Sequence, residues 1–198
     1  TELAADWSRE GDWIVYHTNN PETKRDLWAM PLNGDRMPVP ILQEPGEETN
    51  PALSPDGRFL AYQSNVSGEI EIHVIPFPGG GNRWQVSTNG GLFPRWNATG
   101  TELFYVTENT MMSVQVDTRN GFEPGAPQTL FTGEDVGALL SPSGSDVSAN
   151  LALAVPTYDV TSDGQRFVVS QIVETQSDEE DTPTLTIVEN WFKEFEKK

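Results

Sequence analysis

The two histidines of the chain, His17 and His73, are the residue type from which acid–base or metal chemistry is most often built. Each lies in a strand-like stretch of a different segment. Neither has a second His or a Cys at the spacing that a metal site needs. We therefore expect both histidines to be structural or surface residues.

The motifs do not support hydrolase or kinase chemistry. A Gly-x-Ser-x-Gly elbow does not occur, and Ser54 belongs to a turn that accounts for it. The run Gly79–Gly81 lies between two predicted strands, whereas a phosphate-binding glycine loop opens a helix. The acidic segment Ser177–Asp181 lacks the spacing of a calcium loop and is expected to be a solvated hairpin tip. We expect no catalytic residue, metal or cofactor.

Two arginine–tryptophan pairs are the candidate binding residues. They are Arg83 with Trp84, and Arg95 with Trp96. Arginine and tryptophan are both enriched at the energetic centres of protein interfaces. The alternative is that each pair packs a strand against its neighbour, as tryptophan often does in a core. That packing role is also expected for Trp7 and Trp191.

A repeated turn must position these residues. Its clearest copy is Leu53–Gly57, in which Pro55 presets φ, the polar side chains bond to the turn, and Gly57 can take positive φ. Each copy has an apolar residue, then Ser, Asn or Thr, two variable positions and Gly, and an apolar strand follows. The copies end at Gly11, Gly57, Gly100 and Gly164, at steps of 46, 43 and 64 residues.

A period near 45 residues with several strands per unit is typical of propeller blades. The sequence therefore predicts an all-β chain, a β-propeller of four-stranded antiparallel blades. The repeats are expected at residues 1–46, 47–90, 91–156 and 157–198. The segment 132–156 is expected to be an inserted surface loop, ordered by its leucines.

Charge and composition narrow the partners. The net charge of −18, from 30 acidic and 12 basic residues, repels phosphate backbones and anionic lipids, so nucleic acid is not expected. No apolar run approaches the ~20 residues of a membrane span. Cysteine is absent, which excludes disulfides and thiolate metal sites. We expect a periplasmic or otherwise extracytoplasmic location, with a cytoplasmic one left open.

Several collinear segments resemble the TolB-type, WD-repeat-like propeller family, most closely the C-terminal propellers of bacterial serine/threonine protein kinases. They are DLWAMPLNGD (26–35), LSPDGRFLAYQSN (53–65), VIPFPGGGNRWQVS (74–87), GGLFPRWNATGTELFY (90–105), FEPGAPQTLF (122–131), YDVTSDGQRF (158–167) and IVENWF (187–192). The family usually has six blades, so the resemblance implies that these four repeats are part of a six-bladed ring. It also implies that Lys198 is near a natural C-terminus and that Thr1 is a cut.

The resemblance implies a non-catalytic module that binds a protein or small ligand, as a sensor or scaffold domain of a larger kinase-associated signalling protein. The alternatives are the gating propeller of an S9-type serine peptidase and a free periplasmic TolB-like scaffold. Four blades cut from a ring would leave open faces that favour self-association. The residues then expected to be partly bare are Trp7, Trp13, Trp28, Phe167, Trp191 and Phe192.

Overall fold

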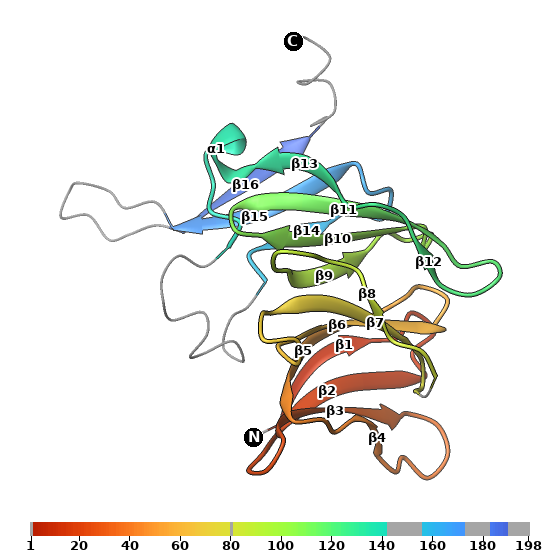
Figure 1. Cartoon of the computed structure of the whole chain (residues 1–198). Coiled ribbons are helices and arrows are strands. Elements are labelled where there is room, and N and C mark those ends of the chain that lie inside the picture. The colour runs from red at the N-terminus through yellow and green to blue at the C-terminus, as the bar shows by residue number, and fades with distance from the viewer. Residues whose placement is uncertain (1, 80, 142–155, 173–182, 190–198) are drawn as a thin grey trace.

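The computed structural model describes residues 2–79, 81–141, 156–172 and 183–189 (Figure 1). These residues are mostly β-strand, as predicted, and their single helix is the four-residue α1 (Gly133–Val136). Among them, no helix has the length and apolar character to cross a membrane. The acidic tip at 177–181 and the terminal residues Trp191 and Phe192 lie outside the described residues.

The first two units together form an eight-stranded sheet. The first unit comprises β1 (Glu2–Trp7), β2 (Trp13–Asn20), β3 (Lys24–Pro31) and β4 (Val39–Leu42). The second comprises β5 (Gly46–Leu53), β6 (Phe59–Ser64), β7 (Glu71–Pro76) and β8 (Trp84–Gln85). Successive strands within each unit pair antiparallel, and a short parallel pairing of β3 with β5 joins the two units.

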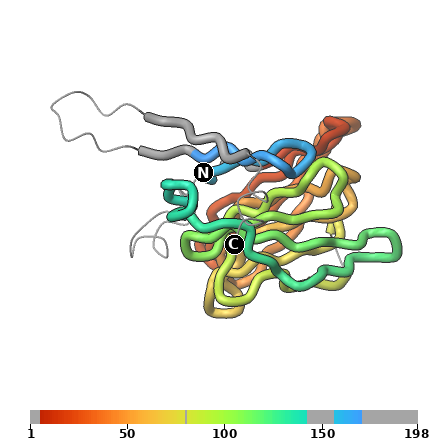
Figure 2. The backbone as a smooth tube through the Cα atoms, turned by 90° about the horizontal axis from the view of Figure 1, so that it is seen from above, coloured from red at the N-terminus to blue at the C-terminus, as the bar shows by residue number. Residues whose placement is uncertain are grey.

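Two further sheets form the third and fourth units. The third comprises β9 (Leu92–Trp96), β10 (Glu102–Thr107), β11 (Thr110–Asp117), β12 (Glu123–Pro124) and β13 (Gln128–Thr132). The fourth comprises β14 (Tyr158–Val160), β15 (Arg166–Ile172) and β16 (Pro183–Glu189). Figure 1 shows the first unit at the bottom, the second above it, and the third and fourth overlapping at the top. Seen from above in Figure 2, the blue strands of the fourth unit lie along one side of the green third unit.

The four predicted repeat turns are confirmed. Gly11, Gly57, Gly100 and Gly164 have φ of 75°, 68°, 69° and 72°. The N–H of each glycine donates to the carbonyl of the Ser, Asn or Thr three residues earlier, at 2.8 to 3.2 Å. This left-handed conformation is the one for which glycine has no steric cost. The four sequence repeats therefore correspond to four copies of the same turn conformation.

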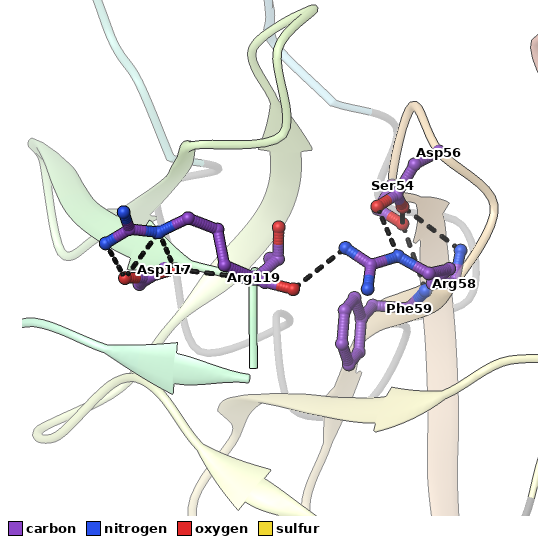
Figure 3. Close-up of polar contacts among 7 residues, drawn as sticks. Ser54, Asp56, Arg58, Phe59, Asp117 and Arg119 are labelled. Atoms are coloured by element: carbon purple, nitrogen blue, oxygen red, sulfur yellow. Dashed lines mark hydrogen bonds and ion pairs between the residues drawn. The ribbon is translucent and has the colours of Figure 1, made fainter. Parts of the chain in front are cut away.

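The second of these turns also contacts the third unit (Figure 3). The Ser54 hydroxyl accepts the N–H of Phe59 at 3.0 Å and donates to Asp56 at 2.6 Å. Arg58 pairs with Asp56 at 2.7 Å, and its Nη2 donates to the carbonyl of Thr118 at 2.9 Å. The turn thus connects β5–β6 to the loop after β11.

Apolar side chains fill the space between adjacent units, as in face-to-face sheet packing. Leu27 of the first unit packs with Leu53 and Leu60 of the second. Ile72 and Val74 of the second pack with Leu103 and Val114 of the third. Each middle sheet therefore buries both of its faces. This explains why Glu71 and His73, on the face of β7 opposite Ile72, are also buried.

Three expectations are corrected. Phe167 is fully buried rather than partly bare, because it faces the third unit and packs against Phe104 and Phe131 at ring distances of 5.2 and 5.4 Å. The packing role expected for Trp7 is wrong, since this residue ends β1 and is 61% exposed. The 132–156 segment does not begin as a surface loop: it opens with α1, and Leu140 is buried in the core between the third and fourth units. Residues 142–155 lie outside the described part.

Candidate binding site

The first strands of all four units line one cavity of about 580 Å³, named here the axial pocket. The first unit contributes Asp6, Trp7 and Arg9; the second Ala52, Leu53, Ser54 and Pro55; the third Arg95, Trp96, Asn97 and Ala98; and the fourth Asp159, Val160 and Ser162. The repeat explains this convergence. The two residues before the Ser, Asn or Thr of every repeat turn, equivalent to Arg95 and Trp96, lie in the wall.

Hydrogen bonds between units hold the wall of the axial pocket together. Asp6 Oδ2 accepts the N–H of Leu53 at 2.7 Å, and Trp96 Nε1 donates to the carbonyl of Ala52 at 3.0 Å. Arg9 Nη1 donates to the carbonyl of Ala98 at 3.2 Å. The N–H of Ala98 in turn donates to the carbonyl of Ser162 at 3.0 Å. These bonds connect the first unit to the second and third, the second to the third, and the third to the fourth. The pocket is therefore a built feature of the repeat array.

Two polar groups of the first strands, Asp6 in the wall and Tyr158 next to the wall residue Asp159, are held by hydrogen bonds. Burial raises the pKa of Asp6, although its carboxylate accepts the N–H groups of Leu53 and Trp7 and lies in the field of Arg95. Burial also raises the pKa of Tyr158, whose hydroxyl donates to the carbonyl of Phe93 at 2.6 Å. Asp6 and Tyr158 therefore act as structural hydrogen-bonding groups of the first strands.

The structure separates the two predicted arginine–tryptophan pairs. Arg95 and Trp96 line the axial pocket. Arg83 pairs with Glu44 at 2.5 Å near the outer edge of the second unit, and Trp84 packs against Phe122 at a ring distance of 5.2 Å. For Arg83 and Trp84, the observed contacts are those of the packing alternative.

Sequence reasoning did not single out Asp6, Arg9 or Asp159. Asp6 and Asp159 occupy the same repeat position as Arg95, directly before the apolar residue of the turn. Arg9 is the first variable residue of the first turn. An alignment of the four repeats would have shown that Asp6 and Asp159 are equivalent to Arg95, and that Arg9 follows three residues after Asp6.

Two other hollows are lined by fewer units than the axial pocket. One, of about 560 Å³, lies along the β11–β12 hairpin beside Asp117 and Arg119, and the third unit alone supplies its wall. The other, of about 380 Å³, lies between the second and third units and includes Glu47, Glu69 and Glu108. Among the described residues, no group of three His, Cys, Asp or Glu side chains could hold a metal ion.

His17 and His73 are buried, with exposed fractions of 6% and 4%. The surface alternative for them is therefore wrong, and neither lines one of the three hollows. Burial lowers the pKa of each imidazole, and a nearby arginine adds to the effect.

No protein-family model and no curated protein matches the sequence. Among solved structures, the chain is similar to TolB from Acinetobacter baumannii, with a TM-score of 0.62 and 14% identity over 96% of this chain. An oligogalacturonate lyase in complex with manganese matches with a TM-score of 0.57 and 15% identity over 90% of this chain. The β-propeller domain of the Trilobed protease from Pyrococcus furiosus matches with a TM-score of 0.51 and 15% identity over 95% of this chain.

The chain spans 41%, 45% and 55% of the lengths of these three structures, in the same order. At such identities the likeness concerns the fold and carries no activity with it. The chain thus has the fold of TolB-like β-propellers and related propeller domains.

Proposed function

We propose that the chain is a non-catalytic β-propeller module that binds a protein or a small ligand in the axial pocket. The observation that carries the proposal is the pocket wall, to which all four units contribute side chains. Concave sites at which several elements converge are the usual places for ligands. The similarity to the TolB fold supports a scaffold function by analogy.

We further propose that these four units belong to a six-bladed ring in a larger signalling polypeptide. The resemblance of the sequence to kinase-associated propellers supports this idea, and association with a kinase rests on that resemblance alone. The similarity to the Trilobed protease propeller favours the second candidate, a propeller that gates an S9-type peptidase. A free TolB-like scaffold is the third.

Activity assays test the non-catalytic part of the proposal. The purified chain is expected to give no ester, peptide or ATP hydrolysis above the buffer rate, because its motifs provide no nucleophile–base–acid set and no phosphate loop. Turnover that a single point substitution abolishes would overturn this part. Mass spectrometry of the preparation would exclude a contaminating hydrolase as the source.

A fragment screen by NMR tests the site. We expect ligands to shift the amide signals of Asp6, Ala98 and Ser162, and Ala98→Trp to abolish these shifts by filling the cavity. Thr118→Trp in the β11–β12 hollow is the matched control and should leave them unchanged. Fragments that bind only at that hollow, or binding that survives Ala98→Trp, would contradict an axial site.

A further inference from the structure

The charge of the axial pocket differs from that of the chain as a whole. The chain has 12 basic against 30 acidic residues, yet the pocket wall holds two arginines, Arg9 and Arg95, and two aspartates, Asp6 and Asp159. Four other arginines make ion pairs with Asp or Glu: Arg25, Arg58, Arg83 and Arg119. Arg36, outside the pocket, donates to the carbonyl of Leu32 and is in none of the ion pairs among the described residues either. What distinguishes Arg9 and Arg95 is that both line one cavity.

Arg9 and Arg95 have no ion-pair partner among the side chains that the structure describes. Arg95 Nη1 donates to the carbonyl of Pro94 at 2.9 Å, and Arg9 Nη1 donates to the carbonyl of Ala98 at 3.2 Å. Each guanidinium has five N–H donors in a planar fork, so most of its donors remain for a ligand. The backbone contacts hold both side chains at the pocket.

The nearby carboxylate of Asp6 does not take these donors. Its Oδ1 accepts the N–H of Trp7 at 2.8 Å and its Oδ2 accepts the N–H of Leu53 at 2.7 Å. Asp159 Oδ1 accepts the N–H of Val160 at 2.8 Å. The backbone thus holds both acids of the pocket, and neither approaches an arginine within ion-pair distance in the described structure.

The same pocket has an aromatic wall. Trp7 is 61% exposed, which is unusual for so large an apolar side chain, and Trp96 lies half-buried in the wall with its indole nitrogen bonded to Ala52. An exposed tryptophan at a cavity provides a flat surface on which a ring can stack. A ligand that suits this site therefore combines an anionic group with an aromatic or apolar body.

We propose that the axial pocket binds a small aromatic or apolar carboxylic acid, whose carboxylate Arg9 and Arg95 contact and whose apolar body lies on Trp7. The proposal rests on the axial pocket being the ligand site of the proposed function. A bidentate contact with a guanidinium is the strong form of carboxylate recognition.

A phosphate would also match the arginine fork, but the charges disfavour it. The chain carries a net charge of −18, and Asp6 and Asp159 flank the arginines. This field opposes a dianion more than a monoanion, since the repulsion scales with the charge of the ligand. We therefore assign the site to a carboxylate.

Three probes of similar shape test this assignment on the intact chain. Benzoate carries the carboxylate, benzamide is its neutral isostere, and phenyl phosphate carries the competing anion. NMR titrations at constant ionic strength follow the guanidinium Nε–H signals of Arg9 and Arg95 and the indole signal of Trp7. We expect benzoate to saturate these shifts with a Kd on the order of millimolar, and benzamide to bind at least about tenfold more weakly.

Substitutions locate the contact. Arg9→Gln and Arg95→Gln should each weaken benzoate by about tenfold, because each removes a charge-assisted contact. Arg95→Lys keeps the charge without the fork and is expected to give an intermediate loss. Arg119→Gln, an equal change of charge on an exposed arginine outside the pocket, should leave the affinity unchanged.

Each other outcome overturns the proposal. If benzamide binds the axial residues as tightly as benzoate, the carboxylate assignment is wrong while the axial site stands. If phenyl phosphate binds more tightly, the ligand class is wrong. If no probe shifts the axial signals although screened fragments do, the inference fails alone. If no fragment shifts them either, the proposed function fails with it.

Discussion

At the scale of single residues, the most unusual feature is a set of buried polar atoms without partners between the first and second units. Glu48 Oε2 and both ring nitrogens of His73 are buried and have no hydrogen-bond partner in the described structure. Tyr62 and His73 are cross-strand neighbours whose rings lie 5.7 Å apart. Because unpaired buried polar groups are costly, ordered water is expected to solvate them.

Glu48 should make the stability of the fold depend on pH between about 4.5 and 7. Burial, with the neighbouring Glu44 and Asp26, raises its pKa from 4.5 to about 7, although the Ser64 hydroxyl donates to it at 3.2 Å. The folded state therefore keeps a proton that the unfolded state loses. The stability contributed by this group is present below pH 4.5 and is lost as the pH rises from there through about 7.

Glu48→Gln should remove this loss, because the amide resembles the protonated carboxyl and does not titrate. Relative to wild type, the variant should gain on the order of 3 kcal/mol between about pH 4 and about pH 8. Urea unfolding at several pH values measures it, with the exposed Glu69→Gln as control. An equal response of both variants to pH would show that Glu48 ionises normally.

His73 should act in the opposite direction. Burial, aided by the charge of Arg83, lowers its pKa below 6.5, so the unfolded state binds a proton before the folded state does. Its stability contribution is present above pH 6.5 and is lost as the pH falls through the folded pKa. His73→Phe should therefore flatten the acidic side of the stability profile. It should also stabilise the protein by about 1 kcal/mol near neutral pH by removing unpaired nitrogens.

The same urea titrations check His73→Phe. If the slope between about pH 7 and about pH 5 is unchanged from wild type, the histidine does not titrate as described. The two groups act over overlapping pH ranges, so the sign of the change distinguishes the variants: Glu48→Gln should make stability rise more with pH, and His73→Phe should make it rise less.

At the scale of elements, the repeat turns are the part of the fold that the sequence predicts best. Turn chemistry is local: Pro55, Gly57 and the polar side chains favour this conformation wherever the segment is placed. Strand order within each unit follows from the turns, since short connections pair neighbouring strands antiparallel. The short helix α1 is also encoded locally, by the capping box of Thr132 and Asp135.

Burial across units could not be predicted in the same way. Ile72 and Val74 alternate with Glu71 and His73, a pattern that is typical of a strand with one buried and one solvent-exposed face. In the structure both faces are buried, because a sheet packs on each side. Likewise Arg95 and Trp96 were selected as a pair, whereas Asp6, Arg9 and Asp159 join them only through the convergence of four repeats.

Two glycines of the repeat turns should respond differently to the same substitution. At Gly57 a Cβ would meet nothing within 4 Å, so Gly57→Ala should cost only the left-handed backbone penalty of about 1 to 2 kcal/mol. At Gly164 a Cβ would lie 3.3 Å from Cζ of the buried Phe104, so Gly164→Ala should cost more. Urea unfolding of both variants measures the difference, and equal costs would mean that Phe104 moves freely.

At the scale of the whole molecule, the described strands form an open stack. No strand pairing among the described residues joins the first unit to the fourth, although the first strands of both line the axial pocket. The outer face of the first unit consequently has no sheet packed against it in the described structure. Since Val15, Leu27 and Ala29 face the second unit, the alternate residues Ile14, Trp28 and Met30 lie on that outer face.

This outer face has the composition of an interface. Ile14 and Met30 are cross-strand neighbours and are only half-buried. The indole nitrogen of Trp28 is buried without a partner among the described residues. In a complete ring a further sheet would cover such a face, and without one its apolar surface favours association.

We therefore expect the isolated chain to self-associate through this face, or to need additional blades on that side for solubility. Sedimentation velocity should show a coefficient that rises with protein concentration. Met30→Glu should shift the chain towards monomer, because a charge on the contact face cannot be buried without a partner. Met37→Glu, the same substitution at a methionine that is 63% exposed in the β3–β4 connection, should sediment like wild type. The expectation would be wrong if the wild-type chain stays monomeric at every concentration, or if the two variants behave alike. Either result would show that the outer face of the first unit does not drive association.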